Sequence, residues 1–272
     1  MDYKEMILEG RKFTKYDDDE NYKSDQDKKL PQPPLAKAAI SEDTIDLPMN
    51  FEDLNLNNDI IDIFYFRASQ RIFTGGKVSL LELSFLLWAS QGVKAIRGNN
   101  YATIRTVPCG GARHEFETYL LVKNVEGLEK GIYHYLPMED KIELLKTLEE
   151  TDALIGKALM GQTWASKANV IFLWSLVPYR AEWRYGIFAH RVMMMDIGHV
   201  GENLYLACEA IGKGTCGLGA FDRKYCNELL DLSGDEEYTV YASPVGTINN
   251  RVKNKEFLSL KAKQKAETQS KE

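Results

Sequence analysis

Hydrophobic residues recur every three or four positions in two segments of the first third of the chain, the spacing of a helix with one buried face. One segment, "NNDIIDIFYFRASQRIF", carries an apolar run that ends near two arginines. The other, "SLLELSFLLWASQGV", begins with a serine that can cap a helix, and Leu80, Leu83 and Leu87 lie at helical spacing. We predict one helix in each segment.

Short runs rich in β-branched and aromatic residues follow, separated by turns. The runs "TYLLVKNVEG" and "KGIYHYLP" predict two strands, and "KIELLKTL" predicts a third strand or a short helix. The near-continuous apolar run "ANVIFLWSLV" predicts a strand that is buried on both faces, and "YTVYASPVG" predicts a last strand. This order is typical of a meander that continues into a central sheet.

The longest helical pattern is "AHRVMMMDIGHVGENLYLACEAIGKG", which is apolar on nearly every side and ends at Gly212 and Gly214. It predicts a buried central helix. Further helices are predicted over "TDALIGKALMG" and over "DRKYCNELL", which Asp222 can cap. Because helices and strands are mixed without a regular βαβ alternation, we predict an α+β fold.

Residues 1–50 differ from the rest of the chain, because they are polar, interrupted by prolines and without an apolar period. We predict an extended N-terminal arm over 1–50 and one globular domain over 51–272. The net charge of −6 and the absence of a dense Lys/Arg block on a predicted element argue against a nucleic-acid-binding protein. No apolar run reaches roughly 18 residues, and the charged opening does not resemble a secretory signal, so we expect a cytoplasmic protein with no membrane span.

The four cysteines form no C-x-x-C pair, and the four histidines are not spaced as metal ligands, so no metal site is expected. Cys208 and Cys226 are interpreted as buried hydrophobic residues. Cys109, in "TVPCGGARHE", could be a nucleophile or a small residue of a loop that lies against a flat ligand. His114 is five positions away, and that spacing alone supplies neither contact with a base nor a lowered thiol pKa.

Two other stretches could bind a ligand. In "RASQR", Arg67, Ser69 and Arg71 occupy alternate positions and could converge on a phosphate if the backbone is extended; the alternative is a solvated helix end. The glycines of "GTCGLGAFD" could expose backbone N–H groups, or form a plain helix cap and turn. A polar stripe of Asp196, His199 and Asn203 on the long helix is interpreted as a hydrogen-bonded core network.

Taken together, these stretches resemble the nitroreductase superfamily of FMN flavoproteins, and more closely its SagB-type dehydrogenase branch, which includes azoline-oxidising enzymes. The resemblance covers roughly residues 60–250. It implies a nitroreductase-like fold with a central mixed or antiparallel sheet flanked by helices, and an intertwined homodimer with FMN at the interface. The motifs that carry it are "RASQRIF", "RTVPCGGARH", "NVEGLEKGIYHY", "RYGIFAHR", "DIGHVGENLYLACEAIGKG" and "GLGAFD".

The resemblance also implies a set of cofactor-binding residues. Arg67, Ser69 and Arg71 would hold the FMN phosphate and ribityl chain, and the N–H groups of Leu218 and Gly219 would face the flavin N5 and O4 edge. Cys109 would be a loop residue beside the isoalloxazine, at a position where the family usually has serine. The remaining expected contacts are Pro108, Gly110, Gly111 and Arg113, on a loop from the partner subunit, and Arg251 near the end of the chain.

Arg184 and Tyr185 stand where the azoline-oxidising members carry Lys-Tyr, and they are the expected catalytic residues. Arginine cannot be deprotonated in a protein, so it cannot act as the base that the lysine is thought to be. We therefore expect hydride transfer from NAD(P)H through FMN to a small organic acceptor. The alternatives are azoline dehydrogenation of a peptide-derived thiazoline or oxazoline, and flavin binding without turnover.

Overall fold

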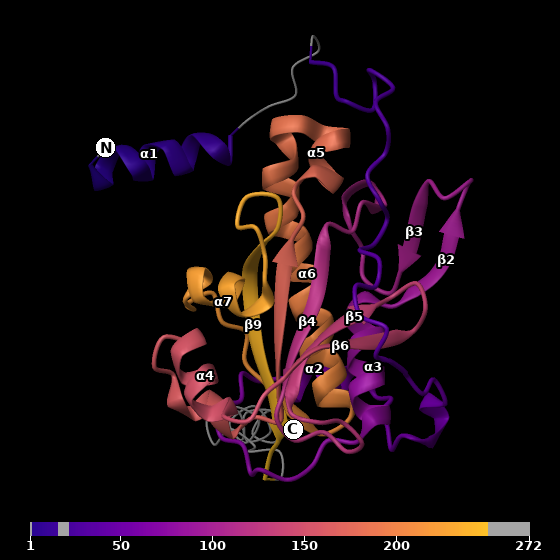
Figure 1. Ribbon diagram of the computed structural model, residues 1–272, viewed down its shortest axis with the longest axis vertical. Coiled ribbons are helices and arrows are strands. Elements are labelled where there is room, and N and C mark those ends of the chain that lie inside the picture. Colours follow the sequence, from indigo (N-terminus) through magenta and orange to yellow (C-terminus); the bar gives the residue numbers. More distant parts are fainter. Residues whose placement is uncertain (1, 16–21, 250–272) are drawn as a thin grey trace, which may run out of the picture.

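A seven-stranded sheet with helices on both faces forms the body of the computed structural model, which describes residues 2–15 and 22–249 (Figure 1). The strand order is β1-β6-β5-β4-β7-β9-β8, every neighbouring pair is antiparallel, and β2 and β3 form a separate hairpin. The strands are β1 (Thr44–Asp46), β2 (Val93–Arg97), β3 (Ala102–Arg105), β4 (Phe116–Val122), β5 (Gly131–Leu136), β6 (Lys141–Thr147), β7 (Val170–Leu176), β8 (Lys213–Thr215) and β9 (Tyr238–Thr247).

The α-helices form two layers. In one layer, α3 and α6 pack on one face of the sheet, and in the other, α4 and α7 pack on the opposite face. The α-helices are α1 (Tyr3–Phe13), α2 (Ile60–Phe66), α3 (Leu80–Gln91), α4 (Thr151–Ala158), α5 (Tyr179–Tyr185), α6 (Ala189–Ala210) and α7 (Arg223–Leu230). The predicted α+β fold is confirmed.

Several local predictions are also confirmed. All seven residues of β7 are buried, with β4 and β9 as its neighbours, as the near-continuous apolar run predicts. The Ser79 hydroxyl accepts from the Glu82 N–H at 3.1 Å and caps α3, and Asp222 caps α7. The run "KIELLKTL" is a strand, and Cys208 and Cys226 are buried.

The N-terminal region differs from the predicted extended arm, because residues 3–13 form helix α1. Its capping box pairs Asp2 with Glu5, and Tyr3, Met6 and Ile7 lie at helical spacing on an exposed helix. From residue 22 onward the chain runs along the body, and β1 adds to the edge of the sheet next to β6. The boundary between an arm over 1–50 and a domain over 51–272 stays a prediction.

Buried charges fasten this N-terminal segment to the sheet. Glu117 on β4 accepts from the Lys37 backbone N–H at 2.8 Å and forms an ion pair with Arg180 of α5. Glu143 on β6 accepts from the N–H groups of Ile40 and Ser41 at 2.8 and 2.6 Å. The ring of His134 lies between the two carboxylates, 3.3 Å from Glu117 and 2.7 Å from Glu143.

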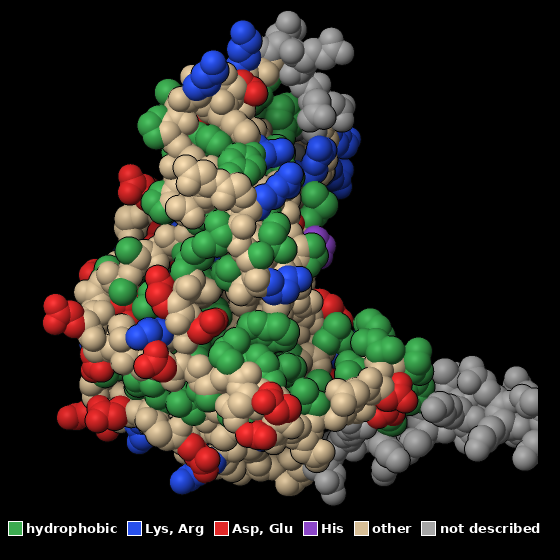
Figure 2. All heavy atoms as spheres, turned by 90° about the vertical axis from the view of Figure 1, so that its right-hand side faces the viewer, with side chains coloured by type: hydrophobic (Ala, Val, Ile, Leu, Met, Phe, Trp, Pro, Cys, Tyr) green, Lys and Arg blue, Asp and Glu red, His purple; other side chains and the backbone are tan. Residues whose placement is uncertain are grey.

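Helix α6 is only partly buried in the single chain, whereas the sequence predicts a buried central helix. Met194 and Met195 are each more than half exposed, as are Ile61 and Phe64 on the neighbouring α2. Figure 2 shows one face of the molecule, where hydrophobic side chains lie over both halves and form a broad patch in the lower half, and most of the Lys and Arg side chains lie in the upper half. None of the described helices is long and apolar enough to cross a membrane.

Candidate functional site

The Pro-Cys-Gly-Gly loop packs directly against the region where α5 leads into α6. Gly111 has a positive φ of 57°, which glycine adopts without strain. A Cβ atom on Gly111 would overlap the Tyr185 hydroxyl and the Arg184 side chain, and one on Gly110 would overlap Val192. The two glycines therefore allow the loop to reach the pair predicted to be catalytic.

Two of the predicted residues, Arg113 and Arg184, contact Tyr101, which was not among the predicted residues. The Arg113 guanidinium lies over the Tyr101 ring, 4.8 Å from its centroid, and donates to the Tyr101 carbonyl at 2.8 Å. Arg184 donates to the Tyr101 hydroxyl and lies 5.4 Å from the centroid of the Tyr185 ring. Tyr101 follows the turn of the β2–β3 hairpin, which no sequence pattern predicted, so no signal pointed to it.

Cys109 is held as a neutral thiol. Its Sγ accepts from the His114 N–H at 3.0 Å and lies within hydrogen-bond distance, 3.2 Å, of Glu115 Oε2. Burial raises the pKa of the Cys109 thiol, and the carboxyl groups of Glu115 and Asp196 raise it further. Burial also lowers the pKa of His114 to about 3. A thiolate nucleophile needs the opposite environment, so these surroundings favour the loop interpretation.

The "RASQR" stretch leaves α2 in an extended conformation, as a phosphate site of alternate residues requires. Ser69 pairs with Thr215 in a β-bridge, and the Gln70 N–H donates to the Thr215 carbonyl at 2.8 Å. The Ser69 hydroxyl lies 3.0 Å from the Tyr205 hydroxyl. Arg67 lies over the Tyr205 ring, 5.4 Å from the centroid, and Arg71 is exposed.

Tyr205 also joins this stretch to the glycine-rich loop. Its hydroxyl accepts from the Gly217 N–H at 2.7 Å, and a Cβ atom on Gly217 would overlap the Tyr241 hydroxyl. The prediction for Leu218 needs correction, because its N–H donates to the Ala242 carbonyl at 2.7 Å and is not available to a ligand. Gly219 is exposed, and its N–H has no hydrogen bond among the described residues. Its role at the flavin edge stays a prediction, and Arg251 lies outside the described residues.

The predicted cofactor-binding residues form two separate groups, each of which contacts a different residue of α6. The first group is the glycine loop, where the Gly110 N–H donates to Asp196 of α6 at 2.8 Å. The second group is the RASQR stretch and the loop at Gly217, where Ser69 and Gly217 contact Tyr205 of α6. Tyr205 is nine positions after Asp196, which corresponds to two and a half helical turns and about 13.5 Å of rise. Asp196 and Tyr205 therefore lie on opposite sides of α6, and the loops that they contact approach the helix from different directions.

The polar stripe on α6 is a core network only in part. Asp196 is buried, and the Asn203 amide donates to the Ala89 carbonyl at 2.8 Å. The His199 side chain is 48% exposed, with Nδ1 3.5 Å from Asp196 Oδ1. The core interpretation is therefore right for Asp196 and Asn203 and wrong for His199.

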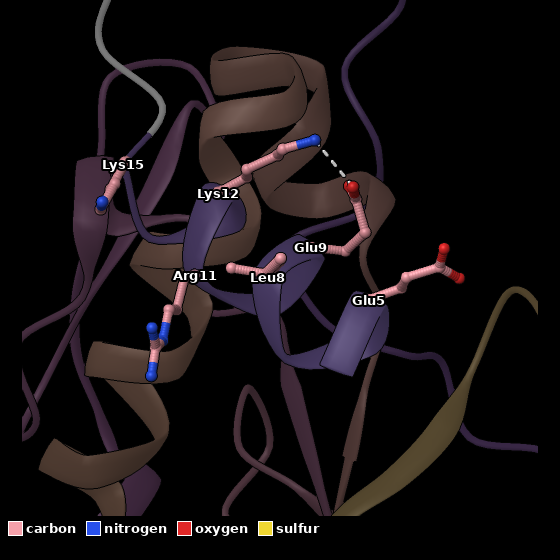
Figure 3. A pocket seen from close by; sticks show the side chains of 6 residues that line it. All are labelled: Glu5, Leu8, Glu9, Arg11, Lys12 and Lys15. Atoms are coloured by element: carbon pink, nitrogen blue, oxygen red, sulfur yellow. Dashed lines mark hydrogen bonds and ion pairs between the residues drawn. The ribbon is translucent and has the colours of Figure 1, made fainter. Parts of the chain in front are cut away.

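Two surface hollows lie away from these groups. The hollow in Figure 3, of about 550 Å³, is formed by side chains of α1 and the residues just after it, including the ion pair of Lys12 and Glu9 at 2.7 Å. A groove of about 980 Å³ runs between the segments 33–38 and 231–238 and along α5. Neither hollow is lined by a residue of the predicted cofactor-binding or catalytic set.

Three relatives resemble the chain in sequence. It is 31% identical over 205 residues to the nitroreductase-type protein MJ1384 of Methanocaldococcus jannaschii, over 75% of this chain and 97% of the relative. It is 31% identical to the trifolitoxin-processing protein TfxB of Rhizobium leguminosarum bv. trifolii, over 48% of this chain and 38% of TfxB. The microcin B17-processing protein McbC of Escherichia coli is 27% identical, over 47% of this chain and 48% of McbC.

Solved structures share the fold. A nitroreductase structure from Ralstonia eutropha superposes with a TM-score of 0.63 at 23% identity, covering 81% of this chain and 95% of that one. A chain of the Escherichia coli microcin synthetase McbBCD complex superposes with a TM-score of 0.58 at 18% identity, covering 91% and 92%. The nitroreductase family model matches residues 65–247, which span both groups of predicted site residues. From this match and the likeness to MJ1384, the chain belongs to the nitroreductase family.

Proposed function

We propose that this oxidoreductase binds FMN without a covalent bond and passes electrons from NAD(P)H to a small organic acceptor. FMN, when bound, accepts a hydride at N5 and passes its electrons on. The exposed polar groups at one end of α6 fit such a cofactor, because Arg67, Ser69 and Arg71 suit a phosphate and a ribityl chain. The unengaged N–H of Gly219 suits an acceptor atom of the ring system.

The observation that carries the proposal is the position of the two groups on opposite sides of α6. One chain offers the phosphate-binding group and the other would offer the Pro108–Gly111 loop, so a complete pocket requires two chains. Exposed apolar side chains on α2 support a homodimer, because Ile61 and Phe64 are large apolar side chains in contact with water in the single chain. FMN would lie where the two chains meet.

Arg184 would serve as a fixed positive charge beside the substrate. Its guanidinium is held by the Tyr101 hydroxyl and by the Tyr185 ring, so its direction is set before a ligand arrives. A cation positioned in this way attracts an electron-rich acceptor and stabilises the negative charge that develops during its reduction. It cannot take a proton from a substrate.

The proposal is tested on the purified protein. We expect a yellow protein whose cofactor is released by heating and chromatographs as FMN, a dimer in sedimentation, and oxidation of NAD(P)H that depends on a quinone or a nitroaromatic. A colourless protein that does not take up FMN would refute flavin binding. FMN binding without turnover with any donor would favour a carrier or sensor.

A second candidate function, azoline dehydrogenation, is favoured by the similarity to TfxB and McbC, whose names describe processing of trifolitoxin and microcin B17. The arginine at position 184 disfavours it. We expect little oxidation of thiazoline or oxazoline peptides by the wild-type enzyme, and more by Arg184→Lys, because burial can lower the pKa of lysine. Efficient azole formation by the unchanged enzyme, with oxygen reoxidising the flavin, would promote this candidate to first place.

A further inference from the structure

Beneath the glycine loop lies a buried cluster that the proposed function does not use. Donor atoms of Cys109, Glu115 and Asp196 lie within 4.8 Å of one another. Glu115 is fully buried and Asp196 is nearly so. Asp196 accepts from the Gly110 N–H, and the Cys109 thiol can donate to Glu115 Oε2. Glu115 Oε1 is buried and has no hydrogen-bond partner among the described residues.

Two carboxylates in one buried place repel each other unless a cation or a proton relieves the repulsion. In the described part of the chain no Lys or Arg forms an ion pair with Glu115 or Asp196. The nearby cations are engaged elsewhere: Arg105 donates to Gln91 and to Thr103, and Arg113 to Tyr101 and Gly111. A single proton held between the two carboxyl groups would remove the repulsion and give Glu115 its missing partner.

The outer end of the cluster reaches the surface. His199, whose ring is 3.5 Å from Asp196, lies at the edge of the exposed face of α6. At the other end of the cluster, Cys109 is partly exposed on the Pro108–Gly111 loop, which the proposed function places in the cofactor pocket. The groups thus form a continuous line from a surface imidazole, through two carboxyl groups, to the thiol.

We propose that Glu115 and Asp196 hold one proton between them and relay it from His199, at the surface, to Cys109, at the glycine loop. The inference rests on the proposed function, since hydride transfer from NAD(P)H leaves the receiving molecule one proton short. The Cys109 S–H bond breaks and gives its proton to a group bound against the loop, and a new S–H bond forms with the single proton of the pair, delivered from Glu115. Both carboxyl groups are then ionised, until His199 passes one proton from solvent to Asp196 and restores the pair. No residue changes its oxidation state.

The protonation state of the pair agrees with this role. Burial and the charge of Asp196 raise the pKa of Glu115 to about 7, so the shared proton can leave and return near neutral pH. Cys109, in contrast, stays neutral before and after each transfer, because its raised pKa prevents a lasting thiolate.

The first test needs neither FMN nor turnover. Infrared difference spectra of the FMN-free protein should contain the band of a protonated carboxyl group that disappears as the pH rises through about 7. Glu115→Gln should remove the band, and Glu126→Gln, at an exposed carboxylate on another surface, should leave it unchanged. A wild-type protein without the band would overturn the proposal, as would stoichiometric binding of a divalent cation that both carboxyl groups coordinate.

The second test uses the FMN-loaded enzyme. Glu115→Gln and Asp196→Asn should bind FMN as the wild type does, yet reduce the acceptor about 100-fold more slowly and lose the pH dependence near neutrality. His199→Gln, a surface change that should not affect folding, should slow the reaction less and mainly at high pH. Wild-type rates and pH profiles in all three variants would overturn the relay. If the wild-type protein does not bind FMN, the proposed function is refuted. The infrared measurement then tests by itself whether Glu115 and Asp196 share a proton.

Discussion

Glu115 directly precedes β4 and Glu117 is the second residue of that strand, and both are buried, yet their pKa values shift in opposite directions. Burial alone would raise the pKa of Glu117, but Arg180 and His134 outweigh it and hold that pKa well below its usual range. Burial raises the pKa of Glu115 to about 7, and its acidic neighbour Asp196 acts in the same direction. The charge of the neighbouring side chain therefore decides the state of a buried carboxyl group. Beside a cation it is a permanent anion that fixes structure, and beside another carboxyl group it is an acid that can exchange its proton.

The largest change in stability is expected when Glu117 loses its ion-pair partner Arg180. Arg180→Met should lower the free energy of unfolding by about 3 to 5 kcal/mol, because Glu117 would stay buried without its strongest partner. Denaturant unfolding at neutral pH measures this loss. The double variant Arg180→Met/Glu117→Gln should recover part of it, since the uncompensated charge is then gone. A loss within experimental error would contradict the role given to this ion pair.

A smaller effect of opposite sign is expected at Glu115. Its raised pKa means that the folded protein binds a proton more tightly than the unfolded chain, so stability falls as the pH rises from about 4.5 to about 7. Glu115→Gln should remove this slope and gain on the order of 2 kcal/mol relative to the wild type above about pH 7. Unfolding curves across this range provide the measurement. Parallel pH profiles for variant and wild type would mean that Glu115 is an ordinary ionised carboxylate.

The pH dependence of Glu117 has the opposite sign. Its lowered pKa contributes stability that is present above the unfolded value of about 4.5 and is lost as the pH falls through the lower folded value. In Glu117→Gln the unfolding free energy should therefore depend less on pH in the acid range, while the slope near neutrality, assigned to Glu115, persists. A change in the neutral slope instead would show that the two sites are coupled through β4.

The smallest effect is expected at Cys109. Cys109→Ser should keep FMN and most of the reductase activity, because a hydroxyl can accept from the His114 N–H and donate to Glu115 in the same place. Steady-state rates together with the bound-flavin content measure this. Loss of activity by several orders of magnitude with FMN still bound would support covalent catalysis by the thiol instead.

The sequence predicts the sheet and the main helices because their burial follows short, regular periods. Strand β7 is apolar at almost every position, and α3 carries its own capping box. The β4–β6 meander follows from such local patterns, whereas the pairing of β7 with β4 and with β9 joins strands that are far apart in the chain.

The site is less predictable because its contacts join residues that are far apart in the chain. Gly110 meets Asp196 across 86 positions, and Tyr101 enters through a hairpin without a clear pattern. Tyr205 lay within a predicted helix, yet periodicity says nothing about which loop a side chain touches. The Leu218 error has the same origin, because its hydrogen bond to Ala242 depends on how the loop meets β9.

The segment that Glu117 and Glu143 fasten has a consequence for the order of folding. Lys37 bonds to residues 80 and 200 positions later in the chain, and Ile40 to one 103 positions later. Closing such long loops costs chain entropy before any contact repays it, so contacts of this kind form late. The β4–β6 meander can assemble first, with His134 in contact with both carboxylates, and the segment at residues 37–41 can bind to them afterwards. A segment that precedes the whole sheet in the chain would then be among the last to reach its native position.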